Sequence, residues 1–314
     1  MATNNFKWML QKYDGKDTRF RCPNCGRAHS FTRYISRKHY EADGTIKYAG
    51  DEFGRCNYSS CGYQCYPNSE AKYHDAEPRE VLPKIFYSKD DVRQFRVGAS
   101  QGNLIRYLLT KIDPNVLQMV LKDYAVGYLD KANIYLDETK TYKEYRDGTI
   151  FWQIDHELNI RRGKVMFYRS DGHREKRDEK RGVIQMMWQV LRRNRGNEPD
   201  MCYFGQHLCN LYPDKAIAIV ESEKTAIVAA CVLPEFNWLA TSSINNFNAE
   251  RLSFLNQVNK PVLVYPDHDG FAEWTSKVEK LRHLFPKQTI SISDSIIRHG
   301  DGKQDIADIL LSNL

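Results

Sequence analysis

The chain has 314 residues, of which 41% are hydrophobic and 27% are charged, as in a globular protein with room for two or three domains. No apolar run approaches the roughly 20 residues of a membrane-spanning helix. The opening stretch, MATNNFKWMLQKYDGKDTRF, has neither the apolar core nor the cleavage site of a secretory signal. These features exclude a membrane protein and lead us to expect a cytoplasmic one.

Charge is distributed unevenly along the chain, whose formal net charge is +6. Residues 214–314 contain ten Lys and Arg against thirteen Asp and Glu, which makes this part −3 and leaves +9 for residues 1–213. A basic segment suits an acidic polymer, whereas an acidic segment suits a cation. We therefore expect different parts of the chain to hold these two kinds of partner.

Cysteine spacing near the start predicts a metal site. The cysteines form two close pairs, each followed by glycine: Cys22 with Cys25 in CPNCG, and Cys56 with Cys61 in CNYSSCG. Four thiolates at such spacing make a closed tetrahedral site for structural Zn²⁺, which helps to fold a module too small to stabilise itself. Residues 1–75 are thus predicted to form a zinc ribbon. Reduced buried cysteines are the alternative, and other possible ligands are Cys65, His29, His39 and His74.

The middle of the chain mixes helical and strand-like patterns. The stretch YHDAEPREVLP, residues 73–83, is polar and contains proline, which is typical of a linker. Helical patterning follows in residues 92–112, and GTIFWQI and GKVMFY are typical of strands. We predict an α+β domain over residues 76–212.

From residue 213 onward the pattern becomes regular. Four apolar runs, each followed by a segment of helical character, are KAIAIV, FNWLAT, PVLVYPD and QTISIS. Strands that alternate with helices predict a parallel sheet, and functional side chains gather at the carboxyl ends of its strands. The predicted fold class is therefore multi-domain α/β, with residues 213–314 as the parallel-sheet domain.

Carboxylates follow two of these predicted strands. Glu221 comes directly after AIAIV, and Asp267 and Asp269 stand in VYPDHDG. Mg²⁺ and Mn²⁺ prefer such oxygen ligands, and phosphoryl transfer needs divalent cations that bridge phosphate oxygens. We therefore predict Glu221, Asp267 and Asp269 as the catalytic, metal-facing residues.

Further candidates lie nearby. Asp305 and Asp308 stand one turn apart at the start of the last predicted helix, where they either complete a metal site or cap the helix. Lys224 either approaches a phosphate or pairs with a neighbouring glutamate. A polar loop suited to phosphate follows the second strand and contains Ser242, Ser243 and Asn245.

A basic segment precedes the predicted parallel sheet. Residues 161–196 contain twelve Lys and Arg against four acidic residues, with Phe167, Tyr168 and Trp188 among them. Such a mixture suits phosphate neutralisation and base stacking, although a charge run is usually only a solvated face. The residues predicted to contact nucleic acid are Arg161, Arg162, Lys164, Arg169, Arg174, Lys176 and Arg177.

The order of these parts resembles the bacterial replicative primases of the DnaG type, and more closely the primase-like Toprim proteins of plasmids and phages. CPNCGRAHSF resembles the primase zinc ribbon, and GTIFWQIDHELNIRRGKVMFY and CYFGQHL resemble segments of the primase core. ESEK, ATSS, PDHDG and DIAD follow in the order of the Toprim motifs. The chain departs from the family pattern at Ser222, where glycine is usual, and at Ser242 and Ser243, which replace a glycine-containing loop. Phe271 with Ala272 replaces the usual Ala-Gly after the two aspartates.

The resemblance implies a Toprim domain in which Glu221 is a general acid/base or metal residue, and Asp267 and Asp269 are metal ligands. It further implies synthesis of short RNA primers with Mg²⁺ from nucleoside triphosphates on a single-stranded DNA template, for a phage or mobile element. Because the chain ends after DIADILLSNL, we expect any replicative helicase to act in trans. The alternatives are a Toprim nuclease, which uses water in place of a 3′-hydroxyl, and a non-catalytic nucleic-acid-binding module.

Overall fold

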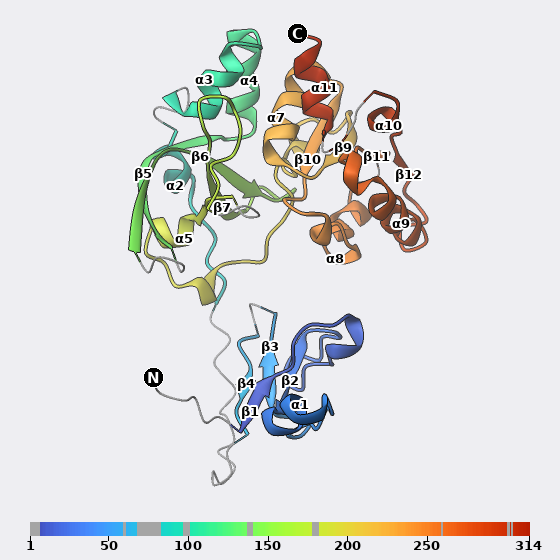
Figure 1. Ribbon diagram of the computed structural model, residues 1–314. Coiled ribbons are helices and arrows are strands. Elements are labelled where there is room, and N and C mark those ends of the chain that lie inside the picture. The colour runs from blue at the N-terminus through green and yellow to red at the C-terminus, as the bar shows by residue number, and fades with distance from the viewer. Residues whose placement is uncertain are drawn as a thin grey trace. The chain divides into compact units, whose positions relative to one another are not determined.

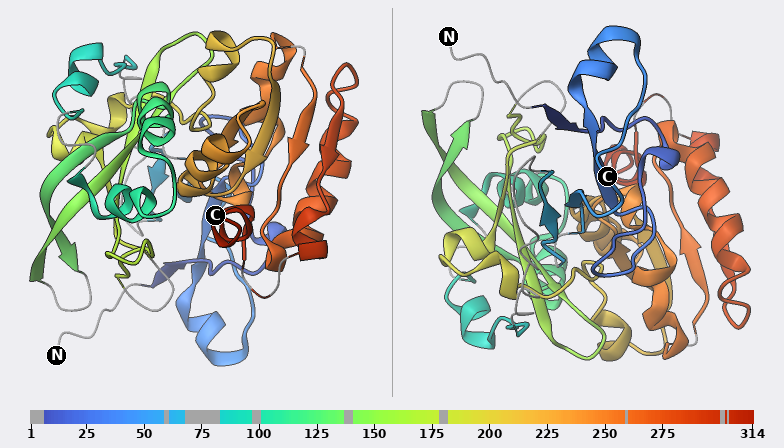
Figure 2. Two further views of the ribbon diagram at one scale, coloured as in Figure 1. Left: turned by 90° about the horizontal axis from the view of Figure 1, so that it is seen from above. Right: turned by 90° about the horizontal axis from the view of Figure 1, so that it is seen from below.

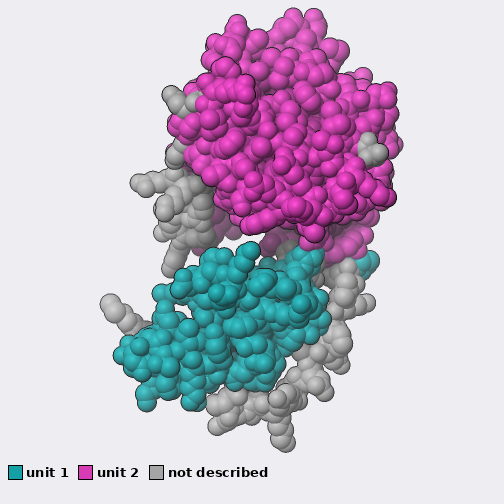
Figure 3. Space-filling view, turned by 90° about the vertical axis from the view of Figure 1, so that its right-hand side faces the viewer, with its two compact units in different colours: residues 1–83 teal, residues 84–314 magenta. Residues whose placement is uncertain are grey.

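The computed structural model describes residues 7–58, 61–67, 83–96, 101–136, 141–177, 182–258, 260–299, 302 and 304–314. The chain divides into two compact units, residues 1–83 and residues 84–314 (Figure 3). Of the predicted linker only Pro83 is described, and His74, Lys180 and Arg181 also lie outside the described residues. The boundaries predicted at residues 75 and 212 stay predictions.

The first unit contains an antiparallel sheet in the order β1-β2-β3-β4. Its strands are β1 (Trp8–Leu10), β2 (Phe31–Ser36), β3 (Gly54–Cys56) and β4 (Gln64–Cys65), with the 3-10 turn η1 (Lys16–Thr18) and helix α1 (Arg37–Asp43). Gly54 is required where β3 pairs with β2, because a Cβ at this position would lie 2.2 Å from the Thr32 carbonyl oxygen. Beside the metal-site cysteines Cys22 and Cys56, Phe31 is the buried residue of the local hydrophobic cluster. So small an apolar core needs a further source of stability.

The second unit begins with helices and a second antiparallel sheet, in the order β5-β6-β7-β8. Its elements are α2 (Lys89–Arg93), α3 (Asn103–Leu109), α4 (Pro114–Asp123), β5 (Gly127–Leu136), β6 (Thr141–Ile154), β7 (Ile160–Phe167), β8 (Ile184–Met186), α5 (Met187–Val190), η3 (Arg195–Asn197) and α6 (Leu208–Leu211). Helix α4 begins where it does because the Asp113 carboxylate accepts hydrogen bonds from Asn115 N and Val116 N, with Pro114 at the first helical position. The predicted helical stretch 92–112 contains the last two residues of α2 and the whole of α3.

The predicted parallel sheet is present, in the order β10-β9-β11-β12 (Figure 1). Its strands are β9 (Ala216–Val220), β10 (Phe236–Ala240), β11 (Val262–Val264) and β12 (Ile290–Ile292), paired in parallel throughout. The connecting elements are α7 (Glu223–Val232), η4 (Ile244–Asn246), α8 (Ala249–Leu252), η5 (Ser253–Asn256), η6 (His268–Gly270) and α9 (Phe271–Arg282), followed after β12 by α10 (Ser295–His299) and α11 (Ile306–Ser312). Together with the N-terminal zinc ribbon, this arrangement confirms the predicted multi-domain α/β class.

Alternation along β9 places apolar side chains on both faces of the parallel sheet. Ala218 and Val220 pack with α7 and α11, whereas Ile217 and Ile219 pack with α8 and α9. Helices therefore cover both faces of this sheet (Figure 2). A strand buried on both faces reads as a continuous apolar run, which is why AIAIV was recognisable in the sequence. Across the described residues, no helix has both the length and the apolar character needed to cross a membrane.

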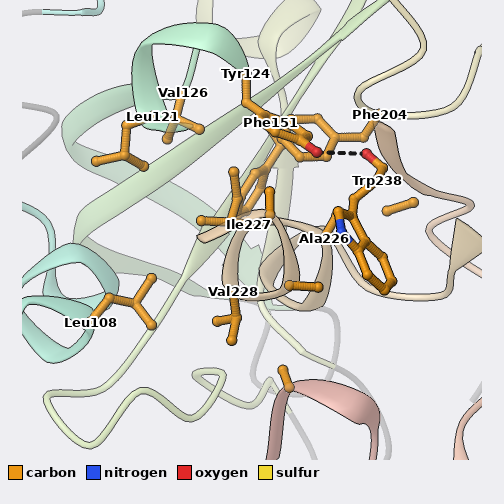
Figure 4. Close-up of a cluster of buried hydrophobic side chains, with 14 of the residues drawn as sticks. Leu108, Leu121, Tyr124, Val126, Phe151, Phe204, Ala226, Ile227, Val228 and Trp238 are labelled. Atoms are coloured by element: carbon orange, nitrogen blue, oxygen red, sulfur yellow. Dashed lines mark hydrogen bonds between the residues drawn. The ribbon is translucent and has the colours of Figure 1, made fainter. Parts of the chain in front are cut away.

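One hydrophobic cluster joins the two sheets of the second unit. It contains residues of α3, α4, β6 and β7 together with residues of β9, α7, β10 and α11. Within it the Tyr124 hydroxyl donates a hydrogen bond of 2.8 Å to the Trp238 carbonyl oxygen, and Phe151, Phe204 and Ile227 pack nearby (Figure 4). The middle region and the parallel sheet therefore share a core, which holds the basic segment and the acidic strand ends in one body.

Candidate functional site

The four predicted zinc ligands converge in the first unit. Their sulfur atoms all lie within 4.8 Å of one another, with Cys22 and Cys61 Sγ 3.7 Å apart and Cys25 and Cys56 Sγ 3.9 Å apart. A tetrahedral Zn²⁺ with bonds of about 2.3 Å requires sulfurs roughly 3.8 Å apart, so the thiols fit this ion. All four positions would be filled by protein, as in a structural site.

Local geometry positions these thiols. Gly26 and Gly62 turn the two knuckles with φ of 66° and 63°, a conformation that glycine adopts without strain. The Asn24 amide donates to Cys61 Sγ at 3.4 Å. Cys65, His29 and His39 do not belong to the cluster, and His39 Nδ1 instead lies 2.9 Å from Ser36 Oγ.

In the second unit, the polar strand ends meet at one edge of the parallel sheet. Glu221 directly follows β9, and Asp267 lies just beyond the neighbouring strand β11. Both line a cavity of about 640 Å³. Its lining contains carboxylates and cations: Glu221, Asp267, Asp305 and Asp308 with Arg169, Arg174, Lys176 and Lys224.

The carboxylates at this edge are poorly neutralised. Burial raises the pKa of Glu221 above its ordinary value, an effect that Arg174 partly opposes. Burial, followed by the charges of Asp305, Glu221 and Asp269, raises the pKa of Asp267 to about 7. Among the described residues no salt bridge reaches Glu221, Asp267 or Asp269. An added cation would therefore stabilise the ionised carboxylates.

The oxygen donors of these carboxylates are of the kind that an open magnesium site uses. No three of their oxygens lie as close together as the four thiols do, within the described part of the chain. Mg²⁺ is commonly held by one or two carboxylates while it keeps water and substrate phosphates as its other ligands. Glu221 and Asp267 fit that role. Asp269 is exposed on η6, and its negative charge contributes to the raised pKa of both Glu221 and Asp267.

Asp305 and Asp308 cap helix α11 and also line the cavity. Asp305 Oδ1 accepts hydrogen bonds from Ala307 N and Asp308 N at 2.8 and 3.2 Å, and Asp308 Oδ2 accepts one from Asp305 N at 3.1 Å. Asp305 Oδ2 also accepts one of 2.5 Å from Thr225 Oγ1. The capping alternative is thus realised, and the two carboxylates still face the same cavity as Asp267.

A tight turn after β7 carries three of the cavity's Lys and Arg side chains, Arg169, Arg174 and Lys176. Gly172, with φ of 76°, allows the turn to pass over Tyr107, whose ring would lie 2.4 Å from a Cβ at this position. The turn pairs Tyr168 with Arg174, and Arg169, His173, Arg174 and Lys176 line the cavity. Our sequence reasoning missed Gly172 and His173, although the Asp-Gly pair in RSDGHRE is a turn signal.

Lys164 requires a correction, because it is not a surface contact for nucleic acid. Its Nζ lies 2.9 and 3.0 Å from the two oxygens of Glu223, and both side chains are buried. Burial alone would favour the neutral acid, but Lys164 keeps the pKa of Glu223 below its ordinary value. Sequence reasoning missed this pair because charge density does not reveal which side of a strand each side chain occupies.

Three other predicted contacts lie away from the cavity lining. Arg161 Nε donates to Asp155 Oδ2 at 2.6 Å, and Arg162 Nε lies 3.3 Å from Glu198 Oε2. Arg177 is half-buried. Of the predicted basic residues, Arg169, Arg174 and Lys176 share the cavity with the carboxylates.

The serine loop after β10 is used internally. Ser242 Oγ donates a hydrogen bond to Glu223, and Ser243 Oγ accepts one of 3.3 Å from Asn245 N. Ser242 has φ of 63°, a conformation that favours glycine, whereas Ser222 has an ordinary φ of −96°. Of Ser222 and Ser242, only Ser242 therefore stands where the backbone conformation itself favours glycine.

Comparisons with known proteins place these features in context. A zinc beta-ribbon finger model matches residues 6–76. The chain is also similar to a solved DNA primase domain from Pseudomonas aeruginosa, with 12% identity over 71% of this chain and 73% of that chain and a TM-score of 0.44. The RNA polymerase domain of Mycobacterium tuberculosis primase DnaG matches with 11% identity over 71% of this chain and 76% of that chain and a TM-score of 0.45. The zinc-binding and RNA polymerase domains of Aquifex aeolicus primase match with 13% identity over 98% of this chain and 77% of that chain and a TM-score of 0.43. The comparison with curated proteins gave no match.

A second family model matches residues 102–268, which is more than half of the chain. Its range runs from α3 to the first residue of η6 and thus includes the basic turn, Glu221 and Asp267. The chain belongs to the family described as a domain of unknown function, DUF6371.

Proposed function

We propose that this protein is a primase-like nucleotidyltransferase that joins ribonucleotides on a single-stranded DNA template. The observation that carries the proposal is the cavity at the strand ends, where carboxylates and cations line the same space. Nucleotidyl transfer needs both, because the carboxylates hold a divalent cation and the basic side chains hold phosphates of the polymer or the triphosphate.

Each part of the cavity has a distinct task in this reaction. The 3′-oxygen of one nucleotide forms a bond to the α-phosphorus of the next, the bond to pyrophosphate breaks, and the hydroxyl proton is released. A divalent cation held by Glu221 and Asp267 would neutralise charge that develops on the phosphates. Arg174, Lys176 and Arg169 orient the phosphates, and Asp305 adds a further carboxylate.

Other expectations accompany this proposal. In this proposal the zinc ribbon is a second element that holds the template, and its zinc has a structural role only. A role in phage or mobile-element replication and a helicase partner in trans remain predictions of the sequence resemblance, and a cytoplasmic location remains a prediction from the hydrophobicity pattern. None of them is needed for the chemistry of the cavity.

The decisive experiment measures incorporation of labelled nucleoside triphosphates on single-stranded DNA with Mg²⁺ or Mn²⁺. We expect template-dependent RNA from the wild type and a loss of about 100-fold or more in Asp267→Asn, since removal of a single charge-stabilising group costs on this order. Asp214→Asn is the matched control, because Asp214 is exposed in the loop before β9 and does not line the cavity.

The other outcomes are equally informative. Shortening of the template that Asp267→Asn abolishes would establish a nuclease in place of a primase. Binding of the template with neither product, while a known primase is active in the same buffer, would leave a non-catalytic binding module.

A further inference from the structure

A second cavity lies in the 84–314 unit, with no residue in common with the acidic site. It has a volume of about 220 Å³ and lies between the segment before α2 and the region formed by α5 and the residues after it. The residues that line it are Ile85, Tyr87, Trp188, Arg193, Asn194, Asn197 and Glu198, whose carboxylate is buried and lies 3.3 Å from Arg162 Nε. Nothing in the proposed reaction uses this cavity.

Its walls are fixed by strong interactions. Both oxygens of the Asp91 carboxylate accept hydrogen bonds of 2.8 Å from Arg193 Nη2, and the Arg193 guanidinium lies 4.5 Å from the centre of the Tyr87 ring. The Tyr87 hydroxyl donates a hydrogen bond of 3.1 Å to the buried Glu198, and its ring packs edge-on against Trp152. These interactions hold the Tyr87 ring in place, so the aromatic wall of the cavity is formed before any ligand binds.

Trp188 differs from the buried tryptophans of this unit. Trp152, Trp238 and Trp274 are fully buried, whereas Trp188 is half-buried and lines the cavity. Ile85 at the same cavity is 52% exposed. Part of the apolar lining is therefore open to solvent and available for stacking.

Polar groups in the wall are left without partners. Arg193 Nη1 and Asn197 Oδ1 are buried and find no hydrogen-bond acceptor or donor among the described residues. Buried polar atoms of this kind are usually paired, so this wall contains one donor and one acceptor whose partners are missing. An aromatic wall beside unpaired polar atoms suits a flat ligand that carries hydrogen-bonding groups along its edge.

The surroundings of the cavity are cationic. Arg192 and Arg195 are exposed, and the Arg195 guanidinium lies 6.0 Å from the centre of the Trp188 ring. Lys84 Nζ donates to the carbonyl oxygens of Gly196 and Glu198, both at 3.2 Å. A flat apolar ligand attached to an anionic chain fits these charges better than a neutral peptide does.

We propose that this cavity binds a nucleobase of single-stranded nucleic acid, which stacks on Trp188 while the strand's phosphates lie against Arg192 and Arg195. Stacking of bases on aromatic side chains, flanked by cations, is a general mode of single-strand binding. The inference rests on the proposed function in one respect, namely that the ligand is a polynucleotide. It adds a holding site that does not depend on the metal-binding carboxylates.

The test is binding of labelled oligothymidylate to the zinc-loaded protein, without added Mg²⁺, Mn²⁺ or nucleoside triphosphates, beside an abasic strand of the same length. The assay is independent of catalysis, so a failed primer synthesis would not affect it. We expect the wild type to bind the base-containing strand roughly tenfold more tightly than the abasic one. Trp188→Ala should abolish most of that difference, and Trp188→Phe should retain part of it.

A second substitution protects the test against misfolding of Trp188→Ala. Ile85→Asp adds a negative charge at the cavity and should weaken oligothymidylate binding by a similar factor. Leu284→Asp, the same change at a residue that is 61% exposed and outside the cavity, should not. Equal binding by Ile85→Asp, Leu284→Asp and the wild type would overturn the proposal, and so would a wild type that binds abasic and base-containing strands alike.

Discussion

Asp267 carries the least compensated charge of the acidic cavity. Burial and the neighbouring Asp305, Glu221 and Asp269 raise its pKa to about 7, from an ordinary value of 3.8, while Arg174 acts in the opposite direction. The folded protein therefore binds a proton at Asp267 over a pH range in which the unfolded chain has released it. Such a carboxylate lowers stability when ionised and gains from a bound cation.

We predict that, without added Mg²⁺ or Mn²⁺, this residue makes the wild type less stable as the pH rises from about 4 to about 7. Asp267→Asn should be more stable than the wild type at pH 8, by on the order of 2 to 4 kcal/mol, and nearly equal to it near pH 4. Urea denaturation of both proteins at each pH measures the difference. Mg²⁺ at pH 8 should stabilise the wild type but not the variant, and a difference that is independent of pH would contradict this account.

At the scale of elements, a buried ion pair joins strand β7 to helix α7. Lys164 belongs to β7, and Glu223 is the first residue of α7, two positions after Glu221. Ser242, from the loop after β10, also donates to Glu223. The pair thus connects the antiparallel sheet to the loop that carries Glu221.

Breaking this pair on one side should be costly. Lys164→Met leaves a buried carboxylate without its countercharge, and we expect a loss of about 3 to 5 kcal/mol in the free energy of unfolding. The double variant Lys164→Met, Glu223→Gln should lose less than Lys164→Met alone. Lys131→Met is the control, because its pair with Glu144 is exposed and should contribute about 1 kcal/mol or less. Chemical denaturation of all three distinguishes these effects, and equal losses in the single and double variants would refute the assignment.

Helix α11 allows the two tasks of Asp305 to be separated. Asp305→Ala removes the N-cap and should cost about 1 to 2 kcal/mol, whereas Asp305→Asn keeps an acceptor for the backbone N–H groups. We expect Asp305→Asn to retain most of its stability and still to reduce nucleotide incorporation, because it loses the negative charge at the cavity. Thermal melting and the incorporation assay measure the two effects. Full activity in Asp305→Asn would limit this residue to capping.

At the scale of the whole molecule, the two units depend on different sources of stability. The first has a small apolar cluster around Phe31 and four converging thiols, whereas the second has a hydrophobic core shared by two sheets. Structural zinc supplies folding free energy directly, so its loss should affect the first unit and leave the second folded.

We therefore predict that Cys25→Ser abolishes stoichiometric zinc and the unfolding transition of residues 1–83, while the transition of residues 84–314 persists. Cys65→Ser is the control, since Cys65 lies outside the thiol cluster and should leave zinc content unchanged. Metal analysis combined with calorimetry and hydrogen exchange measures both properties. Unfolding of the two units together on zinc removal would contradict their independence.

The sequence by itself was sufficient for features that depend on local pattern. Paired cysteines before glycines indicated the thiol cluster, and the apolar run AIAIV indicated a strand buried on both faces. Because parallel strands end at one edge, their order along the chain also predicted that Glu221 and Asp267 would lie near each other. These inferences need only spacing and hydrophobicity, which the sequence contains explicitly.

Tertiary structure decided what each charged side chain does. Lys164 and Arg174 belong to the same basic segment, yet Lys164 is buried against Glu223 and Arg174 faces the carboxylates. Residue composition cannot make this distinction, because it depends on which side of β7 meets α7 and on the turn at Gly172. The second cavity likewise exists only because residues around Tyr87 meet those around Trp188 and Arg193, contacts across about a hundred positions of sequence that no local pattern encodes.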